Sequence, residues 1–402
     1  MSSRQRSWFA LCGVLPLLVW GFGWFGAAPA FPYRVSAVSM HAANTVVLGL
    51  WLCGLGLDRR RALIAAALWS VMPIQAESLF WEDAFPNLLG STALIVALAL
   101  ATQPSIFARL GAVAFWTTAL FLQPTAVLGA FALLYTMAVS PPTPGGADSE
   151  DSRPAVGIPA VVGGATFAIW WTARDLSGFQ LPRDLPLDFS ALGASLGEAV
   201  LRAVGLGETL RAGGPPLHGI TIMAAVALLA TGWYAWRASR RYPHVTLSVL
   251  ALSLIGVAQV LIGQNQGAFV VDPDHFFYLT SVIIPVIAVC AWTSPKQEPG
   301  RRDLAAAAGV VATLSFFCWV SVSQRASYDD FESMLTREIR MGRASAKVYR
   351  LRGVERMRRQ DPCAAEMDFR SSFALAMTER ERAQARELGL DALHACADTK
   401  AQ

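Results

Sequence analysis

Long apolar runs constrain this 402-residue chain more than any other feature. A helix that spans a bilayer needs about 20 mostly apolar residues, and fewer when it packs within a bundle of such helices. The runs that meet this requirement number about eleven, which predicts an all-α, polytopic membrane helix bundle. They are residues 8–26, 35–57, 62–80, 88–102, 108–122, 125–139, 155–173, 217–236, 244–262, 276–292 and 304–322.

The charged residues divide the chain into two parts. Only 15% of the sequence is charged, whereas a soluble domain has about 25%. All of these apolar runs lie in residues 1–322, which we interpret as a membrane domain. Charge crowds into residues 323–402, which we interpret as a water-soluble helical tail. The net charge of +4 is small and dispersed, so we infer no nucleic-acid partner.

Two points decide the number of spans. The apolar stretch 108–139 is too long for one crossing, and Gln123-Pro124 near its middle predicts a hairpin of two short helices, because proline disrupts a helix interior. A single kinked helix is the alternative, and it would reverse the topology of everything downstream. At the N-terminus, Ala28-Pro29-Ala30 is typical of a signal-peptide cleavage site, but the preceding run is long for one, so residues 1–30 are either a retained helix or a cleaved signal.

Basic residues predict the orientation in the membrane. Lys and Arg are enriched in cytoplasmic loops. With the N-terminus in the cytoplasm and eleven spans, thirteen Lys and Arg residues fall in inner segments and five in outer loops. This bias predicts a cytoplasmic N-terminus and a tail outside the cytoplasm.

One outer loop is long enough to contain its own structure. Within residues 174–216, Leu192, Leu196, Val200 and Ala203 recur at helical spacing, with Arg202 on another face. Two interpretations remain open: an amphipathic helix on the membrane surface, or an ordinary helix packed on the bundle.

The tail has the spacing of a tetratricopeptide (TPR) repeat. Large, small, small, aromatic and small residues stand at intervals of 4, 12, 4 and 3, and a third helix, roughly 379–397, follows. The positions are Tyr349, Gly353, Ala365, Phe369 and Ser372.

The tail also contains two cysteines at the ends of predicted helices. Cys363 opens one helix and Cys396 closes the next, so an antiparallel pair brings them together. Because the predicted location of the tail is oxidising, we expect a disulfide between them.

Three stretches carry a resemblance to a known family. They are His41-Ala-Ala-Asn44, then Met72-Pro-Ile-Gln-Ala-Glu77 with Trp81 and Asn87-Leu-Leu89, and Asp274-His-Phe-Phe-Tyr-Leu-Thr-Ser281. In this order they resemble motifs of the transmembrane-and-TPR protein O-mannosyltransferases and their bacterial relatives. The resemblance implies a C-type glycosyltransferase membrane fold, a polyprenyl-phosphate-linked sugar donor and an acceptor outside the cytoplasm.

The chain departs from the family at charged positions. The loop at 27–34 lacks the acidic pair or triad of these enzymes, and Met72 and Phe85 replace an expected histidine and arginine. Asp274 and His275 stand where the family has glutamate and arginine, and Gln123 replaces a lysine. Most of the cations that would hold a lipid-linked phosphate are therefore missing.

Each candidate site residue could have a role other than catalysis or substrate binding. Glu82 and Asp83 are the carboxylates that an active enzyme would use as a general base, although loop acids are usually only solvated. A further set of residues would contact the substrate. Polar residues within membranes also join neighbouring helices by hydrogen bonds. That set is Arg34, His41, Asn44, Glu77, Asp272, Asp274 and His275.

Three functions remain open. The first is a glycosyltransferase, with a divalent cation possible as cofactor. The second is a catalytically degenerate relative that acts as a membrane scaffold and binds a protein partner through the tail. The third, a transporter subunit, would need mid-depth ionisable residues and paired broken helices. In each case the sequence predicts a bacterial inner-membrane protein with a periplasmic tail.

Overall fold

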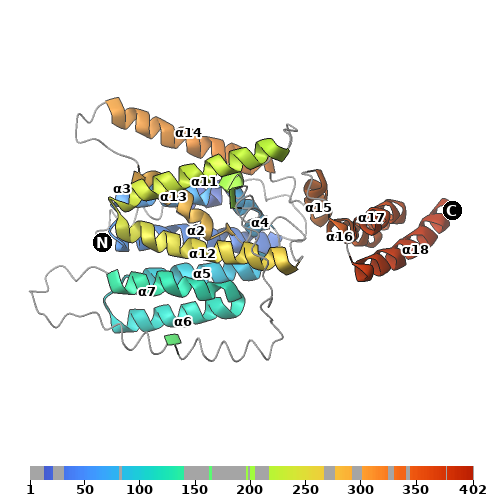
Figure 1. Cartoon of the computed structure of the whole chain (residues 1–402), viewed down its shortest axis with the longest axis horizontal. Helices are drawn as coiled ribbons and strands as arrows, with labels where there is room; N and C mark the ends of the chain where they lie inside the picture. Colours follow the sequence, from blue (N-terminus) through green and yellow to red (C-terminus); the bar gives the residue numbers. More distant parts are fainter. Residues whose placement is uncertain are drawn as a thin grey trace, which may run out of the picture.

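The computed structural model describes most of the chain as helices (Figure 1). The described residues are 13–20, 31–80, 84–139, 163–164, 196–197, 200–203, 217–266, 277–291, 301–324, 330–340, 345–376 and 378–401. Within them every regular element is an α- or 3-10 helix, which confirms the all-α prediction.

The first group of helices, which we call the bundle, lies side by side in Figure 1. Its α-helices are α2 (Phe31–Gly54), α3 (Arg59–Ser70), α4 (Ala76–Phe80), α5 (Phe85–Ala101), α6 (Ile106–Leu122), α7 (Gly129–Val139), α11 (Leu217–Ser239), α12 (Pro243–Gln266), α13 (Ile283–Ala291) and α14 (Arg301–Gln324). Short 3-10 turns join some of them: η1 (Pro73–Gln75), η3 (Pro124–Leu128) and η5 (Thr280–Val282).

Length and apolar character together mark few of these helices as spans. Among the described residues, Tyr33–Gly54 is the one continuous helix that is both long and apolar enough to cross a membrane. The bent pair Arg59–Ser70 and Pro73–Phe80 would be a second. The other apolar helical stretches, such as Phe85–Ala101, Pro243–Ile255 and Ala308–Ser323, are 10 to 17 residues long, so the predicted number of eleven spans stays a prediction. The predicted runs 8–26 and 155–173 lie largely outside the described residues.

The segment 108–139 forms the predicted hairpin. Helix α6 ends at Leu122, and η3 begins at Pro124 after Gln123 has adopted an extended backbone. The indole Nε1 of Trp116 donates to the carbonyl of Ala126 at 3.0 Å, which joins the two arms. The single kinked helix is therefore excluded, and α6 and α7 lie next to each other (Figure 1).

The predicted run 62–80 is not one helix. Helix α3 ends at Ser70, and the chain then bends by 55° into η1 and α4. Pro73 explains the break, because proline has no N–H to continue the helix and its ring clashes with the preceding turn. A second irregular stretch, residues 277–282, precedes α13, so the predicted run 276–292 is helical mainly in its second half.

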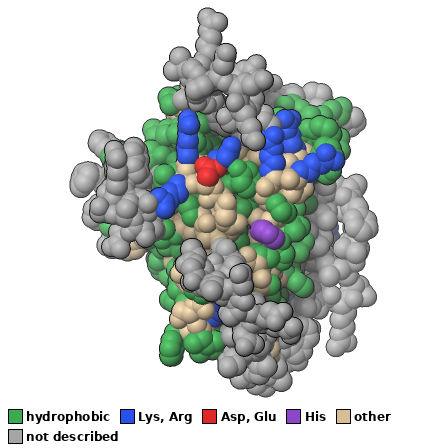
Figure 2. Space-filling model, turned by 90° about the vertical axis from the view of Figure 1, so that its left-hand side faces the viewer, with side chains coloured by type: hydrophobic (Ala, Val, Ile, Leu, Met, Phe, Trp, Pro, Cys, Tyr) green, Lys and Arg blue, Asp and Glu red, His purple; other side chains and the backbone are tan. Residues whose placement is uncertain are grey.

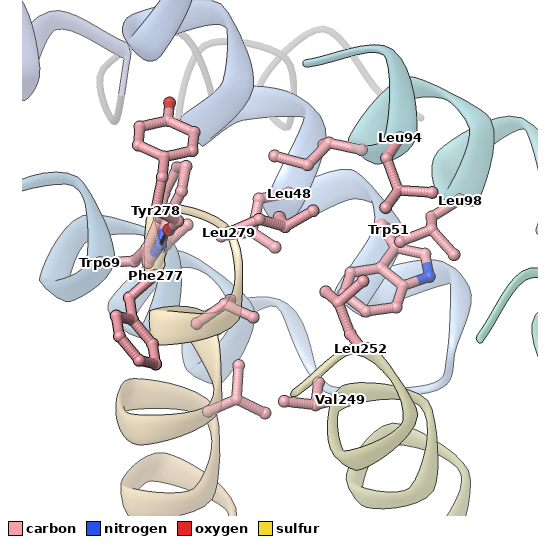
Figure 3. Close-up of a cluster of buried hydrophobic side chains, with 14 of the residues drawn as sticks. Leu48, Trp51, Trp69, Leu94, Leu98, Val249, Leu252, Phe277, Tyr278 and Leu279 are labelled. Atoms are coloured by element: carbon pink, nitrogen blue, oxygen red, sulfur yellow. Dashed lines mark hydrogen bonds between the residues drawn. The ribbon is translucent and has the colours of Figure 1, made fainter. Parts of the chain in front are cut away.

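Large side chains fill the centre of the bundle (Figure 3). Trp51 of α2 and Trp69 of α3 are fully buried. Trp51 lies near Leu94, Leu98 and Leu252, while Trp69 lies beside the 277–279 segment (Figure 3). Residues far apart in sequence thus share one hydrophobic core.

The outer faces of the bundle also carry large apolar side chains. Helices α6, α7, α11 and α14 all contribute to this exposed set. Its members include Phe107, Phe115, Phe121, Phe131, Leu134, Ile222, Val226, Leu229, Trp233, Val311, Trp319 and Val322.

The second group of helices, which we call the tail, projects from one end of the bundle (Figure 1). It consists of α15 (Phe331–Arg340), α16 (Ala346–Arg358), α17 (Pro362–Leu375) and α18 (Glu379–Ala401). Gly353 allows α16 and α17 to approach, because a Cβ there would lie 2.7 Å from the Phe369 ring. Met334 and Leu335 of α15 belong to the same hydrophobic cluster as the bundle core.

The described part of the long loop 174–216 packs inward. Residues 196–197 and 200–203 are helical, and Leu196 and Ala203 pack against the bundle core. Arg202, which the helical spacing puts on another face than the apolar residues, is buried as well, at 6% exposed. The described residues favour a helix packed on the bundle over one lying on a membrane surface.

Candidate functional site

A buried polar network occupies the middle of the three motif-like stretches. Its centre is the hydroxyl of Tyr278, which lies 2.7 Å from Nδ1 of His41 and accepts a hydrogen bond from Nδ2 of Asn44 at 3.1 Å. All three side chains are at most 1% exposed. His41 and Asn44 do share a helix face, as their spacing predicts, and that face turns toward the 277–282 segment.

The direction of each hydrogen bond follows from the acceptor beside Nε2, the second nitrogen of the His41 ring. Nε2 of His41 lies 2.9 Å from the Ser70 carbonyl, which can only accept, so Nε2 carries the proton in the neutral ring. Nδ1 is then an acceptor, and the Tyr278 hydroxyl donates to it. The hydrogen bonds therefore run from Asn44 to Tyr278, then to His41, and end at the backbone of α3.

The network also supplies donors to the two interruptions of the helical backbone. At the end of α3, the Ser70 carbonyl accepts from His41 and from Nε1 of Trp20 at 2.8 Å, and the Val71 carbonyl accepts from Ser321 of α14 at 3.0 Å. These carbonyls lack the helical partners that they would have in a continuous helix. Side chains from three other parts of the chain take the place of those partners.

The second interruption is closed in the same way. The Tyr278 carbonyl accepts from Nε1 of Trp69 at 3.1 Å, from Nε2 of Gln75 at 3.4 Å and from the Ser281 hydroxyl at 2.8 Å. Ser281 also accepts from Trp69 and Gln75, at 3.1 and 3.0 Å. Trp69 and Gln75, which lie on either side of the break after α3, therefore hydrogen-bond the irregular stretch before α13.

This arrangement gives two of the predicted site residues partners within the protein. His41 and Asn44 were candidates for a substrate groove, but their side chains are buried and bonded to Tyr278, Ser70 and Thr92. An unpaired backbone group costs several kcal/mol in an apolar environment. These polar side chains consequently have a structural task that explains their presence without a substrate.

Arg34 lies near the start of α2, at the end closer to the tail. The loop to α3 leaves from the other end of α2. The guanidinium carbon of Arg34 lies 5.7 Å from the centre of the Phe80 ring, and the residue is 7% exposed. Phe80 ends α4, two positions before Glu82 in the sequence. The structure thus brings the predicted outer cation to the segment that leads into the predicted general base, whereas Glu77 lies within α4 on the same side of the break.

Five of the predicted site residues lie outside the described residues. They are Glu82, Asp83, Asp272, Asp274 and His275. Within the described parts of the chain, His, Cys, Asp and Glu side chains form no group of three that could hold a metal ion.

The tail contains a second polar cluster, which the sequence did not single out. Asp368, only 2% exposed, accepts from Nη2 and Nε of Arg352 at 2.6 and 2.9 Å and lies 3.2 Å from Nη1 of Arg356. Arg356 also pairs with Glu332 at 2.8 Å, so the cluster links α15, α16 and α17.

A neighbouring carboxylate extends this cluster toward the surface. Hydrogen bonds from Arg358 and Arg359 lower the pKa of Glu355 to about 2. A lowered carboxyl pKa stabilises the fold above the ordinary value near 4.3, and this contribution disappears as the pH falls toward 2. The Glu355 carboxylate therefore stays charged well below the pH at which an ordinary glutamate is protonated.

The two tail cysteines are joined. Cys363 at the start of α17 and Cys396 near the end of α18 form a disulfide with their Cα atoms 4.8 Å apart. The bond connects the two ends that an antiparallel helix pair places together, as the sequence predicts.

Comparison with known proteins supplies no relative. No protein-family model, curated protein or solved structure matches this chain. The class of the protein therefore follows from its own structure: an all-helical protein with at least one helix suited to cross a membrane, an interior polar network and a disulfide-closed helical tail.

Proposed function

We propose that this protein is an integral membrane scaffold that holds its tail outside the cytoplasm as a binding platform for another protein. The observation that carries the proposal is the Tyr278 network. The motif-like residues that a transferase would use to contact substrate instead close the two interruptions of the backbone. The bundle then serves to anchor and position the tail.

Exposed apolar side chains support the membrane location. Soluble monomers rarely expose apolar patches larger than a few hundred Å², yet the outer faces of four bundle helices carry large apolar residues. Helices shorter than 18 residues can still cross a bilayer as members of a bundle when flanking side chains extend toward the interface. We therefore keep the polytopic prediction as part of the proposal.

The two ends of the bundle support the orientation. Arg59–Arg61 and Arg237–Arg241 lie at one end, and the tail leaves from the other (Figures 1 and 2). Basic residues mark the cytoplasmic side of membrane proteins, and a structural disulfide persists in an oxidising compartment. Both features support the proposal that the tail lies on the extracytoplasmic side.

We predict that a periplasmic reporter fused after Gln402 is active and that a cytoplasmic reporter at the same position is silent. The control is a pair of fusions after Arg241, at the other end of the bundle, where the two reporters should exchange behaviour. A cytoplasmic reporter that works after Gln402 contradicts the orientation. Because α6 and α7 form a hairpin, the error in the number of spans would then lie elsewhere than at Gln123-Pro124.

A glycosyltransferase is the second candidate. It is favoured by the place of Arg34, the buried cation that contacts Phe80 next to the Glu82-Asp83 segment. In a transferase this guanidinium would neutralise a leaving phosphate, and one of the two carboxylates would activate the acceptor hydroxyl. Transport is less well supported, because the carbonyls that broken helices offer to an ion are already hydrogen-bonded here.

We expect the double variant Glu82→Gln/Asp83→Asn to retain the phenotype of the native protein, since a scaffold needs no general base. Removal of a true base would lower a transfer rate by about 10²–10⁴-fold. The comparison variant is Gly353→Leu, whose side chain would collide with the Phe369 ring and disturb the tail. This variant should abolish the phenotype while the bundle stays in the membrane.

The measurement is complementation in the native host, with the membrane level of each variant determined. If the double variant is inactive at a normal protein level, the scaffold proposal fails and the transferase gains. If Gly353→Leu is fully active, the tail is not the functional part.

A further inference from the structure

The end of the bundle opposite the tail, which we call the arginine end, carries a cluster of cations from two separate loops. Arg59, Arg60 and Arg61 begin α3, and Arg237, Arg240 and Arg241 surround the turn between α11 and α12. Figure 2 views this end directly and shows basic side chains gathered on it. Asp58 is the acidic residue of these two loops.

A direct contact joins the two loops. Nη1 of Arg61 donates to the Tyr242 hydroxyl at 2.7 Å, and its guanidinium carbon lies 5.6 Å from the Tyr242 ring. Arg61 also pairs with Asp58, which accepts from the backbone N–H of Arg61 as the N-cap of α3. The one acidic side chain is therefore already used to hold Arg61 in place.

The remaining guanidinium groups keep their charge exposed. Arg59, Arg60, Arg237, Arg240 and Arg241 are exposed, and none of them has an acidic partner among the described residues. Five like charges at one end of the protein repel one another, so a counter-anion stabilises the cluster. Guanidinium groups bind phosphate with two parallel hydrogen bonds, so phosphate is an anion that suits this cluster.

Two aromatic residues beside the arginines indicate which kind of molecule contains the phosphate. The guanidinium carbon of Arg240 lies 4.0 Å from the centre of the Trp236 ring, and Trp236 packs against Trp233 with ring centres 5.1 Å apart. Both tryptophans are about half exposed, at 47% and 58%. Exposed tryptophan beside arginine is typical of the bilayer interface, where the rings lie at headgroup level.

We infer that the arginine end binds the phosphate groups of acidic phospholipids, with Arg237, Arg240 and Arg241 as the principal contacts. The inference rests on the proposed membrane location and not on the role of the tail. A free phosphate offers the same anion but has no acyl chains to contact the two tryptophans. The lipid is therefore the occupant to which the structure points.

The test compares lipids on the purified full-length chain. Thermal unfolding is followed in a neutral detergent with added phosphatidylcholine, phosphatidylglycerol or inorganic phosphate. Phosphatidylglycerol should raise the unfolding temperature at a much lower concentration than either of the others. Stabilisation by phosphatidylcholine alone would retain the membrane location but overturn the acidic-lipid site, and equal stabilisation by inorganic phosphate would overturn the lipid as occupant.

Charge variants locate the site. Arg237→Gln/Arg240→Gln/Arg241→Gln should weaken binding of phosphatidylglycerol by roughly two orders of magnitude, from the usual contribution of three basic side chains near an anionic surface. The control Arg382→Gln/Arg386→Gln removes exposed arginines from the tail and should change nothing. Unchanged binding in the triple variant overturns the proposal.

A second measurement covers the case in which the triple variant does not fold. In the native protein, stabilisation by phosphatidylglycerol should fall steeply between 0.05 and 0.5 M salt, a range over which the screening length decreases from about 14 to about 4 Å. Salt-independent stabilisation would contradict an electrostatic site. The variant Arg237→Lys/Arg240→Lys/Arg241→Lys keeps the charge, so it should retain most of the salt-dependent binding.

Discussion

Replacement of Asp368 by alanine should open the tail. The carboxylate is buried and lies between Arg352 and Arg356, whose side chains are only 11% and 18% exposed. Without it, two partly buried guanidinium groups lose their shared counter-charge. Removal of one partner from a buried ion pair costs about 3–5 kcal/mol, which is a large share of the stability of a small helical unit.

Amide hydrogen exchange of the full-length protein measures this effect locally. The amides of α16 and α17 should exchange far faster in Asp368→Ala, because local opening becomes easier. The matched control is Arg382→Gln, which breaks an ion pair with Glu379 whose side chains are 46% and 86% exposed. An exposed pair contributes about 0.2–1 kcal/mol. Equal exchange in the two variants would show that the buried cluster does not hold the tail together.

Several elements of the fold were predictable from local sequence. Gln123-Pro124 sets the hairpin between α6 and α7, because the proline cannot continue α6 and the extended Gln123 reverses the chain. The disulfide was predictable for a similar reason. Cys363 and Cys396 stand at opposite ends of consecutive helices, and an antiparallel connection places those ends together.

The polar network was only half predictable. His41 and Asn44 were noticed because the stretch that contains them resembles a family motif, but the sequence could not show which groups they contact. Their partner Tyr278 is 234 residues or more away from them in the chain. The signal that was available is Pro73: a proline inside an apolar run leaves backbone carbonyls without partners, and polar side chains elsewhere must then supply donors.

The burial of Arg202 was not predictable from helical spacing. Helical spacing assigns a residue to a face but does not say what covers that face. Arg202 lies on another face of the predicted helix than the apolar residues, and the structure buries that face too. The same limit applies to Asp368, whose two arginine partners come from α16 at 16 and 12 positions before it in the sequence.

The variant Tyr278→Phe should destabilise the bundle although it removes only one oxygen atom. The ring is retained, so the core around Trp69 and Phe277 keeps its volume. What is lost is the hydroxyl that donates to Nδ1 of His41 and accepts from Asn44. Asn44 still donates to Thr92 at 2.9 Å, but Nδ1 of His41 becomes a buried acceptor without a donor. Such a group costs about 1–3 kcal/mol.

The chain offers a matched control for this change. Tyr135 also places its hydroxyl beside Nδ1 of a histidine, at 2.9 Å from His244, but this contact lies at the protein surface where water can replace the lost hydroxyl. Tyr135→Phe should therefore leave the unfolding temperature of the purified protein nearly unchanged, whereas Tyr278→Phe should lower it clearly. If both variants unfold at the native temperature, the Tyr278 hydroxyl does not secure the two interruptions of the backbone. A fully stable Tyr278→Phe variant that loses the cellular phenotype would instead assign that hydroxyl to a substrate, and the transferase would become the better explanation.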